Sequence, residues 1–180
     1  PPAPWTADFE SNQGEAPPRY WINSTGKYVV RDLEGSKVLV KLADNPFTKR
    51  GRLFFGPAEA SEYTVEADVR ATEKRRQMGD AGVIAQRYVL VLFGNTQRLE
   101  LQAWQANSAR STAVPFAWSP DTWYHLKLRV DNLTDGTTQV RGKAWATGDT
   151  EPEAWSIEKV DRMPHRHGSP GLYADAPFEV

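Results

Sequence analysis

The stretch EYTVEADVR, residues 62–70, places apolar and polar side chains in strict alternation. Tyr63 and Val65 fall on one side of an extended chain, while Glu66 and Asp68 fall on the other. A period of two residues is typical of a β-strand with one buried and one solvated face. The stretch therefore predicts a half-buried strand that carries two carboxylates on its polar side.

The same pattern recurs along most of the chain, and no segment keeps a helical period for three turns. Residues 81–93 read as one long apolar stretch or as two strands that meet near Gln86 and Arg87. The charged residues 71–78 predict a short helix or a loop. Roughly ten to twelve short strands separated by turns predict an antiparallel sandwich or barrel. The other predicted strands are 28–33, 37–42, 52–55, 98–105, 123–131 and 139–146.

Length and composition narrow the class further. The chain has 180 residues, a formal net charge of -1, seven tryptophans and no cysteine. The missing cysteines exclude a disulfide scaffold, a thiolate zinc site and a cysteine nucleophile. The small net charge gives no electrostatic footprint for nucleic acid, and no apolar run is long enough for membrane insertion. We therefore expect a proline-rich linker or N-terminal arm over residues 1–7 and one all-β domain over 8–180, with little or no helix.

Large aromatic side chains stand on the polar side of several predicted strands. Trp104, Trp123 and Trp145 alternate with apolar residues that we assign to the core. An indole that faces outward suits sugar binding, because a pyranose ring stacks its C–H face on it while polar neighbours hold the hydroxyls. The alternative is that a loop or arm covers these rings as a second small core. The predicted ligand-binding set is Trp104, Trp145, Gln102, Lys143, Glu66, Asp68, His125 and Lys127.

The acids Glu66 and Asp68 raise the question of catalysis. Two carboxylates at i and i+2 on one strand face stand about 6 to 7 Å apart, near the spacing used by glycosidases. Their spacing also resembles the Glu-x-Asp-x-x-Glu signature of laminarinase-type glucanases, but Arg70 stands where a third carboxylate is wanted. An ordinary solvated strand face with ion pairs across the strands is the alternative. We therefore predict no catalytic residue.

A calcium ion is the one cofactor that the sequence leads us to expect. Calcium is bound by carboxylate and carbonyl oxygens rather than by histidine. Asp8 and Glu10 lie near the start of the chain, and Asp175 lies near its end. These three residues form the predicted metal site on the condition that the terminal strands pair.

Three segments carry a resemblance to a known group of folds. Residues 63–70, the strand WYHLKLRV at 123–130 and the Gly-x-x-Gly-Leu turn at 168–173 resemble concanavalin A-like, laminin-G-like jelly rolls. Within that group the chain looks most similar to bacterial 3-keto-disaccharide hydrolase-like domains found beside quinone-enzyme-like β-propellers, through segments such as 87–90 and 142–155.

The resemblance covers about residues 8–180 and implies a two-sheet antiparallel jelly-roll sandwich with a curved sheet that holds any ligand. It also implies a last strand after residues 178–180, so we expect a truncated final strand. The fold hosts lectins, glycosidases and adhesive modules alike, and activity must be argued from the site.

Together the patterns predict a non-catalytic carbohydrate-binding module of a larger secreted or periplasmic bacterial protein. Its expected partner is a glycan or a neighbouring domain of the same polypeptide. Two alternatives remain open: a glycoside hydrolase that acts on a disaccharide or polysaccharide, and a structural domain that packs against a neighbouring propeller through the same aromatic face. Whether Trp104 and Trp145 line an open surface or are covered distinguishes these functions.

Overall fold

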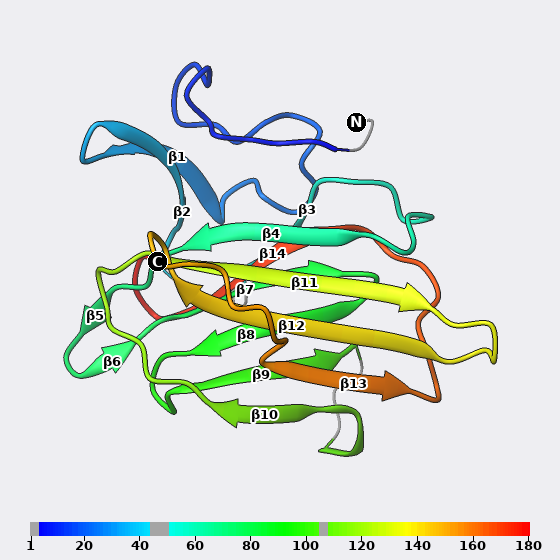
Figure 1. Cartoon of the computed structure of the whole chain (residues 1–180). Coiled ribbons are helices and arrows are strands. Elements are labelled where there is room, and N and C mark those ends of the chain that lie inside the picture. The colour runs from blue at the N-terminus through cyan, green and yellow to red at the C-terminus, as the bar shows by residue number, and fades with distance from the viewer. Residues whose placement is uncertain (1–3, 44–50, 105–107) are drawn as a thin grey trace.

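The computed structural model describes residues 4–43, 51–104 and 108–180, and in these residues the protein is all-β (Figure 1). Two large antiparallel sheets face each other, and neither closes into a barrel. The one helical element in the described residues is a short 3-10 turn at Ser108–Arg110. Nothing helical in this part of the chain has the length and apolar character needed to cross a membrane. The predicted β-sandwich is therefore confirmed.

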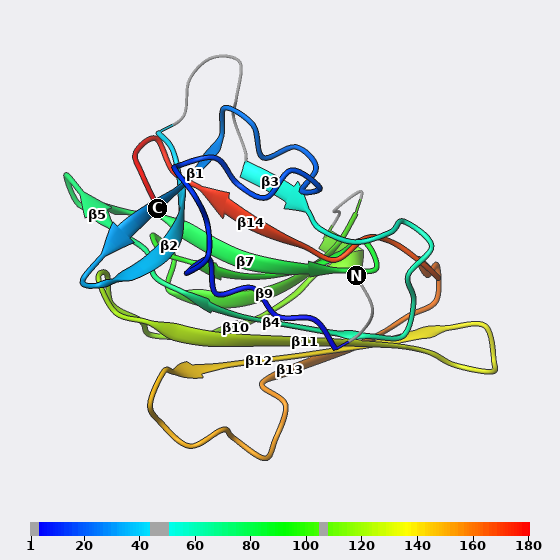
Figure 2. The same cartoon turned by 90° about the horizontal axis from the view of Figure 1, so that it is seen from above.

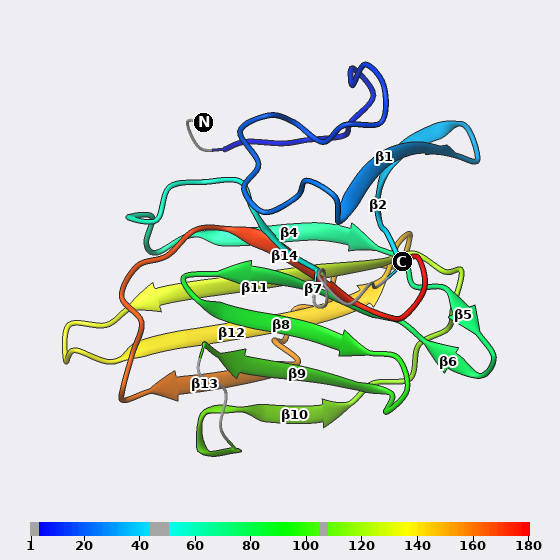
Figure 3. The ribbon, with the colours of Figure 1, turned by 180° about the vertical axis from the view of Figure 1, so that it is seen from behind.

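The larger sheet has six strands in the order β10-β9-β8-β7-β14-β3 and is seen from behind in Figure 3. Its strand β14 comes from the C-terminal end of the chain and lies between β7 and β3. The bounds are β3 Gly51–Phe54, β7 Asp80–Ala85, β8 Tyr88–Phe93, β9 Arg98–Ala103, β10 Thr112–Pro115 and β14 Gly171–Asp175.

The smaller sheet has four strands in the order β13-β12-β11-β4, all antiparallel. Two separate hairpins complete the structure, β1 with β2 and β5 with β6. The bounds in the sheet are β4 Thr64–Val69, β11 Tyr124–Asn132, β12 Thr138–Ala146 and β13 Ile157–Asp161. In the hairpins they are β1 Tyr28–Leu33, β2 Ser36–Lys41, β5 Glu73–Lys74 and β6 Gln77–Met78.

The main core lies between the two sheets. Leu90 and Leu99 of the six-stranded sheet pack with Leu126 and Leu128 of the four-stranded sheet, and all four are fully buried. Alternation assigned Leu99, Leu126 and Leu128 to the inner side of their strands, whereas Leu90 lies in the apolar stretch 81–93 that does not alternate. Gly142 of β12 belongs to this contact, because a Cβ at that position would lie 2.6 Å from a methyl carbon of Leu90. A glycine here lets the two sheets approach each other closely.

A second aromatic cluster lies beside β3 and the β1–β2 hairpin. The ring of Trp5 lies 5.0 Å from that of Phe55 and 6.0 Å from that of Trp21, and Phe9 meets Trp21 edge to face. Burial of these rings removes apolar surface from water and anchors the N-terminal segment to the sandwich. Trp5 falls in the stretch 1–7 predicted as a linker or arm, whose residues 1–3 lie outside the described part of the chain.

Turn geometry settles the two stretches that the sequence left open. Residues 81–93 contain two strands, and Gln86 and Arg87 between them have φ angles of 50° and 68°. Positive φ at both central residues is the signature of a two-residue hairpin turn that follows the twist of its strands. Residues 71–78 form the β5–β6 hairpin, so the predicted short helix or loop is wrong. Arg75 and Arg76 take positive φ at its tip without the glycine or asparagine that normally marks such a turn.

Candidate functional site

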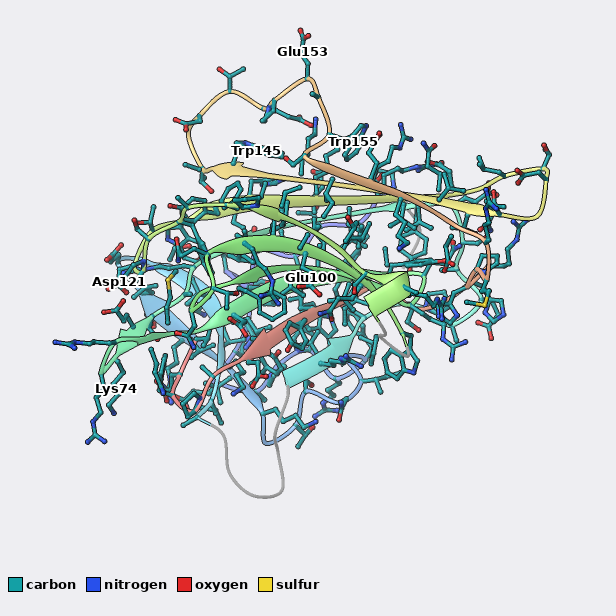
Figure 4. The ribbon with its side chains drawn as sticks, turned by 90° about the horizontal axis from the view of Figure 1, so that it is seen from below. Lys74, Glu100, Asp121, Trp145, Glu153 and Trp155 are labelled. Carbon is teal, nitrogen blue, oxygen red and sulfur yellow. The ribbon has the colours of Figure 1, made fainter. Side chains whose placement is uncertain are left out.

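The structure divides the predicted ligand-binding set between two opposite faces. The outer side of the four-stranded sheet, here the front face, presents the polar positions of β4, β11 and β12. The outer side of the six-stranded sheet, here the back face, presents the polar positions of β9 and the outward residues of β3, β7, β8 and β14. In Figure 4 Trp145 and Trp155 lie at the base of the loop that carries Glu153, away from Glu100 of β9. The front face holds Glu66, Asp68, His125, Lys127, Lys143 and Trp145, and the back face holds Trp104 and Gln102.

On the front face the two predicted acids are paired across the strands. Asp68 lies opposite His125, and Glu66 lies opposite Lys127. The Nδ1 atom of His125 is 2.9 Å from a carboxylate oxygen of Asp68, and the Nζ atom of Lys127 is 3.0 Å from one of Glu66. The ring of Trp145 lies 4.6 Å from the imidazole of His125. The structure therefore brings these predicted residues together, and their main interactions are ion pairs and ring contacts with one another.

The loop between β12 and β13 adds a second layer to this network. It projects from the four-stranded sheet on the side away from the other sheet (Figure 2). Glu151 in this loop accepts hydrogen bonds from Lys127 at 2.9 Å, and its carboxylate lies 2.8 Å from the Nζ atom of Lys143. Hydrogen bonds from Lys143 and Lys127 lower the pKa of Glu151 to about 2. Lys143 is 5% exposed and also donates to the carbonyl of Pro152.

The front face is thus a charge-neutralised surface. Its two acids, its histidine and its two lysines all have partners within the same network. A retaining or inverting glycosidase needs one carboxyl group held protonated and a second one free to attack or to activate water. Glu66 and Asp68, held by Lys127 and His125, do not form such a pair. The geometry of this face favours an ordinary ion-paired strand surface over a catalytic site.

The back face is organised around an arginine that the sequence analysis did not select. The guanidinium carbon of Arg52 lies 4.6 Å from the centre of the Trp104 ring and 5.8 Å from that of Tyr173. Arg52 and Tyr173 are cross-strand partners on β3 and β14, whereas Trp104 follows β9. A cation placed over an indole or phenol ring is attracted by the negative face of the π-system. The contact joins distant strands of the sheet.

That contact requires the sheet to curve toward the back face. Between β3 and β9 lie β14, β7 and β8, which is four strand spacings, or about 19 Å in a flat sheet at about 4.8 Å each. The side chains of Arg52 and Trp104 are too short to meet across that distance. Twist and curvature of the sheet therefore bring Arg52 and Trp104 closer together than they would lie in a flat sheet. The back face is therefore concave.

Apolar side chains fill the middle of this concave face. Ile84 of β7 and Val89 and Val91 of β8 are 0 to 2% exposed, although they point away from the main core. Phe54, Phe93 and Tyr173 pack around them. Strands that are covered on both faces have apolar residues at consecutive positions. The long apolar stretch at 81–93 thus reflects a third cluster, which the rings of Phe54, Phe93 and Tyr173 pack against on the back face.

Polar groups flank this cluster along β9. Glu100 pairs with Arg98 at 2.7 Å and accepts a hydrogen bond from the side-chain amide of Gln102 at 3.0 Å. On β7 and β14, which neighbour each other in the same sheet, Asp80 and Asp175 lie directly opposite each other. Burial raises the pKa of Asp80 to about 6, against a hydrogen bond from the backbone N–H of Gly94 that lowers it. The back face therefore combines apolar walls with a few placed polar groups.

A buried polar network holds the backbone at Trp104. Its carbonyl oxygen accepts a hydrogen bond from Arg110 at 3.3 Å and lies 3.2 Å from the Nε2 atom of His165. Arg110 also bonds a carboxylate oxygen of Asp161 at 2.8 Å, and that oxygen accepts a further hydrogen bond from the hydroxyl of Tyr88. Buried polar groups joined by several hydrogen bonds in this way rigidify their surroundings. No local sequence motif marks these residues, because they come from separate elements that meet only in the fold.

The predicted calcium site finds no support in the geometry. Within residues 4–43, 51–104 and 108–180, no three histidine, aspartate or glutamate side chains converge as metal ligands. Asp8 accepts a hydrogen bond from the backbone N–H of Glu10. Glu10 in turn binds Ser36 and the backbone N–H of Lys37 at the turn of the β1–β2 hairpin. Asp175 lies on the back face within hydrogen-bond distance of the Tyr173 hydroxyl. Asp8 and Glu10 therefore make hydrogen bonds in turns near the β1–β2 hairpin, whereas Asp175 lies on the back face.

A cavity of about 510 Å³ opens at the end of the sandwich near the β5–β6 hairpin, and none of the predicted site residues lines it. Gln97 and Asn95 in its wall are used by the fold: Gln97 donates to the carbonyl of Gly94, and Asn95 accepts from the N–H of Met78. The indole of Trp118 at this end donates to the carbonyl of Phe93. Three of the polar groups in its wall therefore have structural partners, and the predicted ligand-binding residues lie elsewhere, so we take the back face as the candidate site.

Comparison with known proteins assigns no role to either face. No protein-family model matches the chain, and no curated protein sequence matches it. A function for this chain is therefore argued from the geometry of the described residues.

Proposed function

We propose that this chain is a non-catalytic carbohydrate-binding module whose glycan lies on the concave back face against Trp104. One observation carries the proposal: the partly exposed indole of Trp104 is held by the guanidinium of Arg52 on the outer side of the six-stranded sheet, on the same side as Gln102 and Glu100. Ligand sites in proteins combine apolar walls with a small number of placed polar groups. A sugar ring matches that combination, with C–H groups on one side and hydroxyls around its edge.

The way in which Trp104 is held supports this role. Arg52 stacks on its ring, and Arg110 and His165 contact its backbone carbonyl. A ring that is already ordered loses little conformational freedom when a ligand arrives, so more of the contact energy appears as affinity. Trp145 on the front face is placed differently, because its neighbours His125 and Lys143 belong to an ion-paired network. The two tryptophans therefore form a matched pair for a test.

Binding to a panel of soluble polysaccharides, measured by affinity gel electrophoresis or by a glycan array, tests the proposal. We expect Trp104→Ala to weaken binding roughly 3- to 10-fold, the loss expected for one aromatic stacking contact. We expect Trp145→Ala to bind like the parent. Near-UV circular dichroism confirms that both variants are folded. Binding that is unchanged in Trp104→Ala, or lost in Trp145→Ala alone, would refute the assignment to the back face.

One observation favours a glycoside hydrolase as the second candidate function. Asp80 and Asp175 face each other across β7 and β14, and burial raises the pKa of Asp80 to about 6. Residues directly opposite in an antiparallel pair have Cβ atoms about 4.5 to 5.5 Å apart, which is compatible with a pair of acting carboxylates. This function predicts turnover of a bound glycan that is lost in Asp80→Asn. Glycan binding without turnover, retained in Asp80→Asn, supports the binding module instead.

A further inference from the structure

Arg52 has a distinctive environment on the back face. Its guanidinium lies on the rings of Trp104 and Tyr173, but within the part of the chain that the structure describes it makes no hydrogen bond and no ion pair. Its Nε atom is buried and has no hydrogen-bond partner among the described residues, which is also true of the Nε atom of Arg141, so the difference between the two arginines is the ion pair that Arg141 makes. A guanidinium carries five N–H donors in a fixed plane, and each buried donor without an acceptor costs free energy.

Other arginines on the two outer faces are used differently. Arg98 pairs with Glu100 on the back face, and Arg129 and Arg141 both pair with Asp131 on the front face. Arg141 makes a useful comparison, because it also lies over an indole, 5.0 Å from the centre of the Trp155 ring. Arg141 therefore combines an aromatic contact with an acidic partner, whereas Arg52 has two aromatic contacts and no acidic partner among the described residues.

The chemistry that satisfies such a guanidinium is a planar anion. An arginine accepts a carboxylate through two parallel hydrogen bonds, and stacking on aromatic rings fixes the plane in which that pair must form. The guanidinium lies over one face of the indole, 4.6 Å from the ring centre, so the proposed sugar ring stacks on the part of the indole that Arg52 leaves open and has its edge toward the guanidinium. In a uronic acid the carboxylate is attached to the ring carbon at one edge, so a stacked ring can present that carboxylate to a neighbouring arginine.

We infer that the glycan bound on the back face is acidic and that Arg52 binds the carboxylate of a uronic acid unit stacked on Trp104. This inference rests on the proposed function and names the ligand class for the same site. The other charges on the face are consistent with a single anion-binding position. Glu100 is already paired with Arg98 and bonded by Gln102. Asp80 on β7 and Asp175 on β14 form an acidic pair on the same face. Such a pair can accept hydrogen bonds from sugar hydroxyls, but it would repel a second carboxylate.

The test compares oligosaccharides that differ only in the charge of the carboxyl group. Oligomers of galacturonate, mannuronate and glucuronate are measured by isothermal titration calorimetry beside the same oligomers with their carboxylates reduced to primary alcohols. We expect the parent to bind at least one acidic oligomer about tenfold or more tightly than its reduced form, as a bidentate bond to a charged group implies. The preference should fall as salt is added. Equal affinity for each acidic and reduced pair overturns the inference.

Variants at Arg52 separate the fork from the charge. Arg52→Gln should bind acidic and reduced oligomers alike, and Arg52→Lys should lose most of the preference because a lysine offers a point charge without the planar fork. Arg141→Gln is the matched control on the front face and should keep the parental preference. If Arg52→Gln keeps the full preference, or Arg141→Gln alone loses it, the inference is wrong.

Two further arms distinguish this inference from the proposed function. A sulfated oligosaccharide bound more tightly than every uronate, in a manner that depends on Arg52, overturns the carboxylate assignment. Tight binding of neutral glycans that depends on Trp104 but not on Arg52 overturns the acidic class and leaves the binding module in place. Absence of binding to every acidic, sulfated and neutral glycan overturns both.

Discussion

Replacing Arg110 with methionine should destabilise the fold by about 3 kcal/mol, the lower end of the range for removing one partner of a buried ion pair. Arg110 and Asp161 have side chains that are 8% and 5% exposed, so neither charge is well solvated. Methionine keeps much of the arginine stem's volume but provides no donor. The loss therefore reports chiefly on the carboxylate of Asp161 that is left behind.

The contacts that remain set this magnitude. Without Arg110, Asp161 still accepts hydrogen bonds from the hydroxyl of Tyr88 at 2.8 Å and from the backbone N–H of Met163 at 3.0 Å. Two remaining donors place the cost near the low end of the range rather than the high end. For a domain of this size about 3 kcal/mol corresponds to a fall in Tm of roughly 6 to 12 °C.

The pH dependence of this loss has a definite sign. Burial by itself raises the pKa of Asp161, but hydrogen bonds from Arg110, Tyr88 and the N–H of Met163 outweigh it and hold that pKa below its ordinary value. In the parent, Asp161 therefore contributes stability above its unfolded pKa of about 3.9, and this is lost as the pH falls through the folded value. In Arg110→Met burial dominates and the folded pKa rises. The variant's deficit should then be smaller at pH 5 than at pH 7.

Urea unfolding followed by tryptophan fluorescence at pH 5 and pH 7 measures both effects. The double variant Arg110→Met, Asp161→Leu should be more stable than Arg110→Met alone, because it removes the stranded charge together with its partner. Arg141→Met is the control, since its pair with Asp131 joins side chains that are 29% and 23% exposed and should be worth less than about 1 kcal/mol. A cost below about 1 kcal/mol for Arg110→Met, or a deficit that is the same at both pH values, would refute this reasoning.

Three other perturbations have defined outcomes. Burial raises the folded pKa of Asp80 to about 6, so Asp80 contributes stability at low pH that is lost as the pH rises through that value. In urea titrations at several pH values, Asp80→Asn should abolish this fall in the free energy of unfolding. The double change Arg75→Asn, Arg76→Gly gives the β5–β6 turn the residues that positive φ favours and should raise the unfolding free energy by about 1 kcal/mol, whereas a decrease would show that the tip is held by its side chains. The carboxyl carbon of Glu151 should titrate near pH 2 by NMR, and Lys143→Met should move that midpoint upward.

Local patterns predicted most of the strands because the pattern and the physical cause are both local. The alternation at residues 62–70, 123–131 and 139–146 corresponds to β4, β11 and β12 within about two residues. The stretch 98–105 corresponds to β9 at Arg98–Ala103, with Gln105 outside the described residues. Each of these strands has one face in the main core, so every second residue must be suited to burial.

Other elements lacked a local signal. The β5–β6 hairpin turns at two arginines, where the usual glycine or asparagine is absent. Its strands are two residues long and pair through two residue pairs. The edge strands β10 and β13 bury only part of one side, so their alternation is weak. The β14 strand owes its position to pairing with both β7 and β3, residues that lie about 90 to 120 positions earlier in the chain.

Alternation identified the side of each strand on which a residue lies, but it did not identify the sheet that each strand joins. Alternation tells which side of its own sheet a residue faces, and it placed both Trp104 and Trp145 away from the core. It carries no information about which of two sheets a strand joins. That depends on pairing between distant segments, and it places Trp104 on the back face and Trp145 on the front face. The predicted ligand-binding set is therefore divided between two opposite surfaces.

A signal for the back face was nonetheless present in the apolar stretch at 81–93. A strand with one solvated face alternates, whereas Ile84, Val89 and Val91 are apolar at positions that point away from the main core. Such residues stay there only if something covers their outer side, because exposed apolar surface of that extent is costly. In this fold the cover includes Phe54, Phe93 and Tyr173, and the guanidinium of Arg52 lies over the ring of Tyr173. A break in alternation in the centre of a sandwich therefore locates a covered face, and the aromatic and charged residues that cover it are the ones to test for a ligand.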